Sequence, residues 1–151
     1  MIEQLSPMAR RVLALDAIEL TFRSFRPSFD ELFDRSTVRF AREALMLLRQ
    51  RLNEDSLGVP EVPFFDDLYA LQENDHSPGT ASIVMAISEC ADSLRRELSS
   101  ADVLAVMSAS YEALLNSERI PRVTMETERS NENCVRLISA QLNLIEAAAS
   151  G

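Results

Sequence analysis

Apolar residues recur every three or four positions through most of this chain, with mainly polar residues between them. This spacing predicts amphipathic helices. The first helix is predicted to begin where Ser6 precedes Pro7, because serine can cap a helix and proline fits its first turn, and to end before Pro27. A second helical stretch, one long helix or two nearly collinear ones, is predicted over residues 28–52, with Ser36 as a candidate second cap.

The helical pattern is interrupted between Asn53 and Phe65, where Gly58, Pro60 and Pro63 predict a long connection. Connections of this length are uncommon in compact domains and are often functional. A short helix should follow, and its apolar and aromatic side chains should hold it to the core. These side chains are Phe64, Phe65, Leu68, Tyr69 and Leu71, and the outer face of the helix is predicted to carry Asp66, Asp67, Gln72 and Glu73. A second loop is predicted over residues 74–79.

The second half of the chain returns to helical periodicity. Thr80 or Ser82 is predicted to open the next helix, and Ser99 with Asp102 has the three-residue spacing of a capping box at the start of another. The short link between these two helices favours an antiparallel pair.

Pro121 interrupts the pattern again, and a last helix is predicted from Thr127 to Ala149. The apolar face of this helix is predicted to consist of Val135, Ile138, Leu142 and Ile145. Alternation with a period of two, which would indicate strands, is missing from the sequence. The pattern therefore predicts an all-α fold, a single-domain bundle of about five to seven helices over residues 1–151.

Composition narrows the class of protein. A net charge of −9 and a pI near 4.6 argue against nucleic-acid binding, which needs a cationic surface. The apolar stretches are shorter than the roughly 18 residues of a membrane span, and the first residues lack the layout of a signal peptide. We therefore expect a cytoplasmic protein that does not bind membranes. Cys90 and Cys134 are expected to be buried, reduced thiols, because two cysteines are too few for a disulfide framework.

Negative charge is concentrated between Asn53 and Gly79, where the chain has no arginine or lysine. The seven acidic residues of this segment are Glu54, Asp55, Glu61, Asp66, Asp67, Glu73 and Asp75. We name residues 53–79 the acidic segment and expect it to connect two helical parts of the domain. Because aromatic residues lie between these acids, the segment has the mixture of anchors and charges that recognition surfaces use.

Several kinds of chemistry lack the residues they need. Lysine is absent from the chain, and His76 is the only histidine. These facts exclude Schiff-base and phosphate-loop lysines and most histidine-based zinc sites. Carboxylate pairs one helical turn apart, such as Asp16 with Glu19, are expected by chance at this acid content. We expect no catalytic residues, no metal and no cofactor.

A stripe of four arginines, which we name the arginine stripe, is predicted on one side of the second helical stretch. Its members are Arg35, Arg39, Arg42 and Arg49. Neighbouring acids such as Glu31 and Glu43 favour a self-paired, solvent-exposed face. A grip on a phosphate or an acidic partner helix, and docking onto the acidic segment of the same chain, are the two alternatives.

From about Phe40 to Ala149 the layout resembles the small all-helical bacterial family typified by YjaG, whose function is unassigned. The resemblance is carried by Phe40-Ala41-Arg42-Glu43 with Leu47 and Leu48, by Asp67-Leu68-Tyr69, by residues 86–98 running into residues 99–115, and by a final helix over residues 131–146. Helical folds of this kind are also similar to the immunity proteins of bacterial toxin systems. Those proteins are small, acidic and cytoplasmic and lack catalytic groups, so the similarity implies a binding role.

The leading hypothesis from the sequence is a non-enzymatic inhibitor or immunity protein whose acidic surface blocks a basic toxin or other enzyme. The predicted partner-binding residues are Glu61, Phe65, Asp66, Asp67, Tyr69, Glu73 and Asp75. The alternative is a helical structural or adaptor protein that forms a homodimer through its first or last helix. An enzyme that uses only carboxylates, arginine or tyrosine is the third hypothesis.

Overall fold

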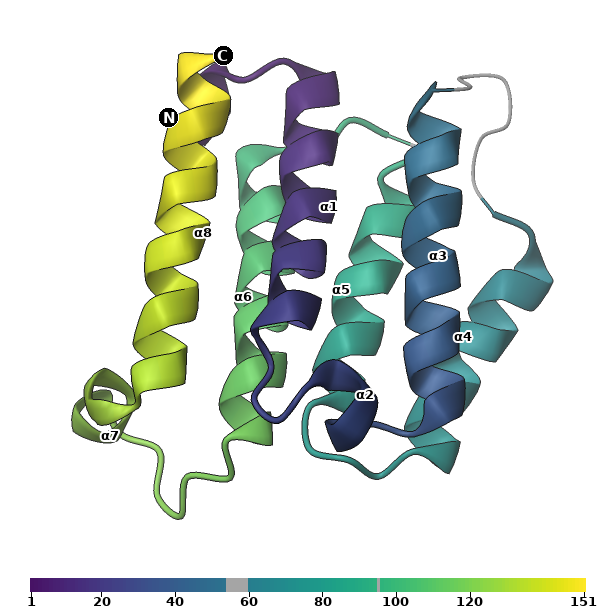
Figure 1. Ribbon diagram of the computed structural model, residues 1–151. Coiled ribbons are helices and arrows are strands. Elements are labelled where there is room, and N and C mark those ends of the chain that lie inside the picture. The colour runs from purple at the N-terminus through teal and green to yellow at the C-terminus, as the bar shows by residue number, and fades with distance from the viewer. Residues whose placement is uncertain (54–59, 95) are drawn as a thin grey trace.

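The computed structural model describes residues 1–53, 60–94 and 96–151, and these residues form helices and the links between them (Figure 1). A short 3₁₀ helix, η1 (Ile2–Gln4), precedes eight α-helices in the described part of the chain. The α-helices are α1 (Pro7–Ser24), α2 (Phe29–Leu32), α3 (Arg35–Asn53), α4 (Val62–Asn74), α5 (Thr80–Asp92), α6 (Ser100–Ser117), α7 (Met125–Ser130) and α8 (Glu132–Ser150). The predicted all-α class is confirmed, with one α-helix more than the expected range.

The long helices stand roughly side by side, with α8 at one edge of the bundle and α4 at the other (Figure 1). Between them, α1 packs on α3, α5, α6 and α8, and α5 packs on α6 as the antiparallel neighbour that their short link predicts. The buried apolar side chains form one cluster, to which every α-helix except α7 contributes. The molecule therefore has two outer edges, one made by α4 and one by α7 and α8.

Side-chain caps fix the helix starts that the sequence predicted. The Ser6 hydroxyl accepts a hydrogen bond from the Ala9 amide at 3.1 Å, so α1 begins at Pro7. At α6, the Ser99 amide donates to the Asp102 carboxylate at 2.9 Å and the Asp102 amide donates to the Ser99 hydroxyl at 3.1 Å. The Arg96 guanidinium and these cap bonds lower the pKa of Asp102 to about 2. The predicted capping box is confirmed.

The second helical stretch is divided into α2 and α3. Phe33 adopts an extended backbone at φ −120° and ψ 158°, which ends α2, and α3 starts at Arg35 rather than at a cap on Ser36. The reason lies in the aromatic side chains around the break, since the ring of Phe29 stacks on that of Phe22 at 4.4 Å and meets that of Phe33 at 5.2 Å. Packing these rings together favours a short turn of helix over a continuous one.

The last predicted helix is also divided, into α7 and α8. Asn131 has ψ 112°, outside the helical range, and its side-chain oxygen accepts a hydrogen bond from the Cys134 amide at 2.9 Å. Thr124 and Thr127 form a second capping box that starts α7 before the predicted position. Two local caps therefore override the periodicity of the apolar residues.

Gly79 closes the link between α4 and α5 against α6. Its φ of 102° is left-handed, and a Cβ added there would lie 2.5 Å from the carbonyl oxygen of Ala113. Glycine is needed at this position for both reasons. The second predicted loop, between Asn74 and Thr80, is confirmed.

Both cysteines are buried and free, as the sequence predicted. Burial raises the pKa of the Cys90 thiol to about 12, with a further contribution from Glu89, so the thiol stays protonated at neutral pH. These thiols act as small core side chains.

Candidate functional site

The edge made by α4 carries most of the residues predicted to bind a partner. Pro63 lies in the first turn of α4, where its missing amide hydrogen is not needed. Leu68 is fully buried, and the ring of Phe64 lies 5.5 Å from that of Phe40 on α3. The apolar side of α4 therefore packs on the bundle, and its other side faces solvent.

Four of the seven carboxylates in the acidic segment are exposed on this edge. They are Glu61, Asp66, Asp67 and Glu73. Within the described residues, none of the four forms an ion pair. Glu54 and Asp55 lie outside the described residues. The predicted outer face of this helix is confirmed, and its negative charge is not neutralised by arginines in the described part of the chain.

Tyr69 and Phe65 differ in how far they reach the surface. Tyr69 is 48% exposed, and its hydroxyl lies 2.9 Å from the Ser88 hydroxyl on α5. Its ring thus lies on the surface in a fixed position. Phe65 is half-buried, with its ring 5.4 Å from that of Phe64 in an edge-to-face contact. Tyr69 is therefore the aromatic side chain of α4 that offers the larger surface to a partner.

Asp75 has a structural role instead of a place on the surface. It is 3% exposed, and its carboxylate accepts hydrogen bonds from the Thr37 hydroxyl at 2.7 Å, the Asp34 amide at 3.1 Å and the Ser77 amide at 2.9 Å. Burial by itself would raise the pKa of Asp75, but these hydrogen bonds outweigh it, and the pKa is lowered. The prediction that Asp75 contacts a partner is corrected, because the carboxylate ties the start of α3 to the end of α4.

The arginine stripe is largely paired within the chain. Arg42 makes two hydrogen bonds of 2.9 Å to Asp30, and Arg39 contacts Glu43 at 3.2 Å. Arg49 bridges to α1, where it contacts Asp16 at 2.8 Å and Glu19 at 3.0 Å. The interpretation of a self-paired face is supported for these three arginines. Their carboxylate partners lie on α1, α2 and α3 and not in the acidic segment.

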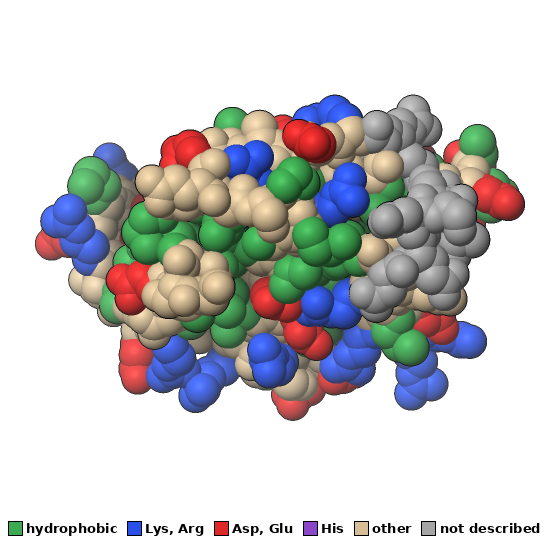
Figure 2. Space-filling view, turned by 90° about the horizontal axis from the view of Figure 1, so that it is seen from above, with side chains coloured by type: hydrophobic (Ala, Val, Ile, Leu, Met, Phe, Trp, Pro, Cys, Tyr) green, Lys and Arg blue, Asp and Glu red, His purple; other side chains and the backbone are tan. Residues whose placement is uncertain are grey.

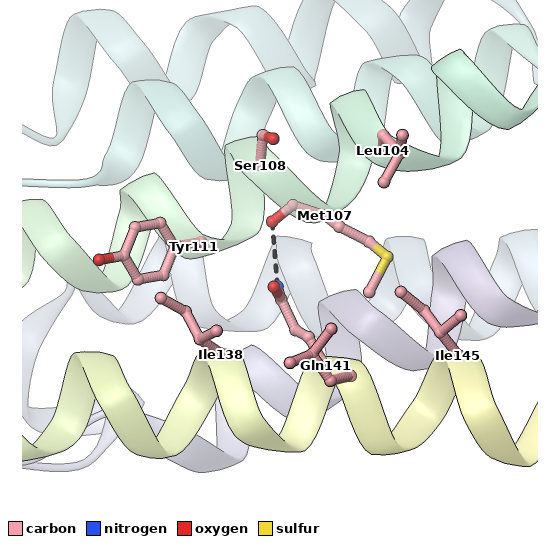
Figure 3. A pocket seen from close by; sticks show the side chains of 8 residues that line it. Leu104, Met107, Ser108, Tyr111, Ile138, Gln141 and Ile145 are labelled. Carbon is pink, nitrogen blue, oxygen red and sulfur yellow. Dashed lines mark hydrogen bonds between the residues drawn. The ribbon is translucent and has the colours of Figure 1, made fainter. Parts of the chain in front are cut away.

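A second candidate surface, not predicted as such from the sequence, lies between α6 and α8 (Figure 3). It is a hollow of about 210 Å³ whose walls are mainly apolar. An adjoining hollow of about 190 Å³ reaches α7 and shares Tyr111 and Ile138 with the first. We name these two hollows together the α6–α8 groove. The residues that line it are Leu104, Met107, Ser108, Tyr111, Met125, Glu128, Arg129, Val135, Ile138, Gln141, Leu142 and Ile145.

The groove corrects the predicted core face of the last helix. Val135 is 44% exposed, Ile138 42% and Leu142 55%, whereas Cys134 and Leu137 are fully buried. Helix α8 thus carries two neighbouring apolar stripes. Three of the four residues predicted for the core face lie on the exposed stripe, whereas the fourth, Ile145, is partly buried and packs against the core. The signal that could have revealed this was the apolar excess of α8, which is more than one buried face needs.

Polar groups hold the groove walls together. The Gln141 side-chain amide donates to the Met107 carbonyl at 3.0 Å and so links α8 to α6 (Figure 3). The Tyr111 hydroxyl donates to the Glu128 carboxylate at 2.7 Å and links α6 to α7. Burial and the bond to Glu128 raise the pKa of Tyr111, which therefore keeps its proton at neutral pH.

The end of the bundle shown in Figure 2 has a more mixed surface than the groove. Apolar, acidic and basic side chains are interspersed there. Among the residues that the structure describes, no group of three histidine, cysteine or acidic residues is arranged to hold a metal ion. None of the described helices combines the length and the apolar character that crossing a membrane would require.

A comparison of the chain with protein-family models, with curated proteins and with solved structures finds no match. The resemblance to the YjaG-typified family and the similarity to immunity proteins therefore stay expectations.

Proposed function

We propose that this protein is a non-enzymatic binding protein of the inhibitor or immunity type, which contacts a basic protein partner through the exposed face of α4. The observation that supports this proposal is the set of four exposed carboxylates that lack ion-pair partners in the described part of the chain. Solvated acids in isolation are common on protein surfaces. Here three of them lie on α4 and the fourth at its N-cap, together with an exposed aromatic ring.

The spacing on α4 suits recognition by a helix face. Val62, Asp66, Tyr69 and Glu73 follow one another at intervals of four, three and four residues, so they share one side of the helix. Val62 is 71% exposed and Tyr69 is 48% exposed. An apolar side chain and a tyrosine between carboxylates provide anchors and orienting charge on the same surface.

The surface is also held in place before binding. Leu68 and Leu71 are buried on the inner side of α4, and Asp75 fixes the end of the helix to α3. A partner would therefore meet carboxylates whose backbone is already ordered, which reduces the entropy lost on binding. Complementary charge would accelerate the encounter with a cationic surface, such as the substrate-binding face of an enzyme that acts on anionic substrates.

The test compares charge reversal on α4 with charge reversal elsewhere. The immobilised wild-type protein captures its partner from the source cell, and the purified partner is then titrated against Asp66→Arg with Asp67→Arg. We expect this double variant to weaken binding by at least about tenfold at moderate salt, while the thermal unfolding midpoint stays within a few degrees. The affinity of the wild type should fall as salt increases.

The matched control reverses two exposed carboxylates away from α4, in the variant Glu97→Arg with Glu112→Arg. This control changes the net charge by the same amount and should retain the partner. If the α4 double variant binds as tightly as the control, the acidic face of α4 is not the binding surface and the proposal fails. If both variants lose binding equally, only the overall charge matters and the specific surface is rejected.

A further inference from the structure

The α6–α8 groove gathers exposed apolar side chains on one edge of the molecule. Of the thirteen exposed large hydrophobic side chains in the described residues, five line its walls: Leu104, Met125, Val135, Ile138 and Leu142. Each of these is at least 42% exposed. Contiguous exposed apolar surface of this kind marks interaction sites more often than solvated surface does.

The same edge also presents a helix that could fill such a groove. Val135, Ile138 and Leu142 form an exposed ridge on α8 at the i, i+3 and i+7 spacing that helices use when they dock into grooves. This ridge forms one wall of the groove on the same chain. A surface with both can pair with a copy of itself around a two-fold axis, because each copy then supplies what the other needs.

Charge specifies how two copies would align. Arg129 lines the groove at its α7 end, and Glu146 lies toward the other end of α8. Both side chains are exposed, and neither forms an ion pair with another described residue. An antiparallel pairing of α8 with its copy brings each arginine toward the other chain's glutamate.

Helix geometry supports this alignment. Leu142 lies about 6 Å above Ile138 along α8 and Val135 about 4.5 Å below it, at about 1.5 Å per residue. When two antiparallel α8 helices cross at Ile138, Leu142 of one copy lies over Val135 of the other. Glu146 lies about 6 Å beyond Leu142, toward the end of the interface where Arg129 of the other copy lines its own groove.

We propose that a second copy of this chain occupies the α6–α8 groove, as an antiparallel two-fold dimer in which Arg129 of each copy pairs with Glu146 of the other. This dimer leaves both α4 edges free, because α4 lies at the far side of the bundle (Figure 1). The inference is independent of the proposed inhibitor function, since it depends on different residues.

Sedimentation equilibrium across the micromolar range tests the dimer. The wild type is expected to associate, and Leu142→Glu is expected to raise the dimer dissociation constant by at least about tenfold. Met46→Glu is the control, since Met46 is 72% exposed on α3. It should dimerise as the wild type does. A wild type that remains monomeric, or a Leu142→Glu protein that dimerises normally, overturns the proposal.

A charge swap tests the antiparallel alignment. Arg129→Glu and Glu146→Arg are each expected to weaken the dimer about three- to tenfold, because each places like charges together. The double variant restores opposite charges at both ends of the interface and should regain most of the wild-type affinity. If the double variant is as weak as the single ones, this alignment is rejected. Thermal unfolding at low protein concentration serves as the control that every variant is folded.

Discussion

Helices α4 and α8 lie at opposite edges of one bundle, and they distribute their apolar residues differently (Figure 1). On α4, Leu68 and Leu71 are buried, and three exposed carboxylates lie on the outer face. On α8, Leu137 is buried, but Ile138 and Leu142 beside it are exposed. These buried and exposed residues are therefore of different types on α4, whereas on α8 both are apolar.

This difference decides whether a substitution can change binding without changing the stability of the fold. At the α4 edge, changing an exposed acid should alter binding and leave the core untouched. At the α8 edge, the apolar ridge adjoins the buried stripe, so a large change there can disturb both packing and association. Matched substitutions at the two edges test whether the edges differ in this way.

The largest expected contrast is between two leucines truncated to alanine. Leu68 on α4 is fully buried, so Leu68→Ala should lower the free energy of unfolding by about 2–5 kcal/mol. Leu142 on α8 is 55% exposed, so Leu142→Ala should change the free energy of unfolding by no more than about 1 kcal/mol. Urea denaturation at a concentration where the protein is monomeric measures both. Equal losses would mean that the two edges are packed alike.

The next contrast is between two acids of the same segment. Asp75→Ala removes the acceptor for the Thr37 hydroxyl and the Asp34 amide, and we expect the free energy of unfolding to fall by about 1–3 kcal/mol. Asp67→Ala, at an exposed position, should change the free energy of unfolding by about 0.5 kcal/mol or less. Denaturant titrations of the two variants decide whether Asp75 has the structural role inferred above.

Asp75 also predicts a pH dependence. Its pKa is lowered in the folded protein below the ordinary value of 3.8, so its carboxylate stabilises the fold above about pH 4. That contribution is lost as the pH falls through the lowered pKa. The free energy of unfolding of Asp75→Asn should therefore depend less on pH below about pH 4 than that of the wild type. If the free energy of unfolding of the two proteins depends on pH in the same way below about pH 4, the lowered pKa of Asp75 is contradicted.

The periodicity of the sequence predicted the fold class well because most helices bury one clear apolar stripe. Where it failed or left two forms open, short-range contacts decided the outcome. The cap at Asn131 split the last predicted helix, and the second helical stretch, predicted as one helix or two, is divided at Phe33, where aromatic rings pack together. The position of a break depends on hydrogen bonds and ring packing between residues, which the spacing of apolar positions does not contain.

The candidate site was predicted in part. The outer face of α4 follows from spacing alone, since Asp66 and Glu73 fall opposite Leu68 and Leu71 on a helix. Spacing could not separate Asp75 from the exposed acids, because its partners on α3 are about forty positions away in the chain. The spacing of apolar residues also could not show which stripe of α8 is buried, because the buried stripe is determined by the positions of α1 and α6.

The smallest expected effect concerns Tyr69, where the hydroxyl and the ring can be tested separately. Tyr69→Phe removes only the contact with Ser88, a hydrogen bond at an exposed position, so the free energy of unfolding should change by about 0.5 kcal/mol or less. Tyr69→Ala removes the ring as well and should weaken partner binding severalfold, while Tyr69→Phe keeps most of the affinity. Titration of the captured partner against both variants provides the measurement. If Tyr69→Ala binds like the wild type, the ring is only a link between α4 and α5, and recognition at this edge depends on the carboxylates alone.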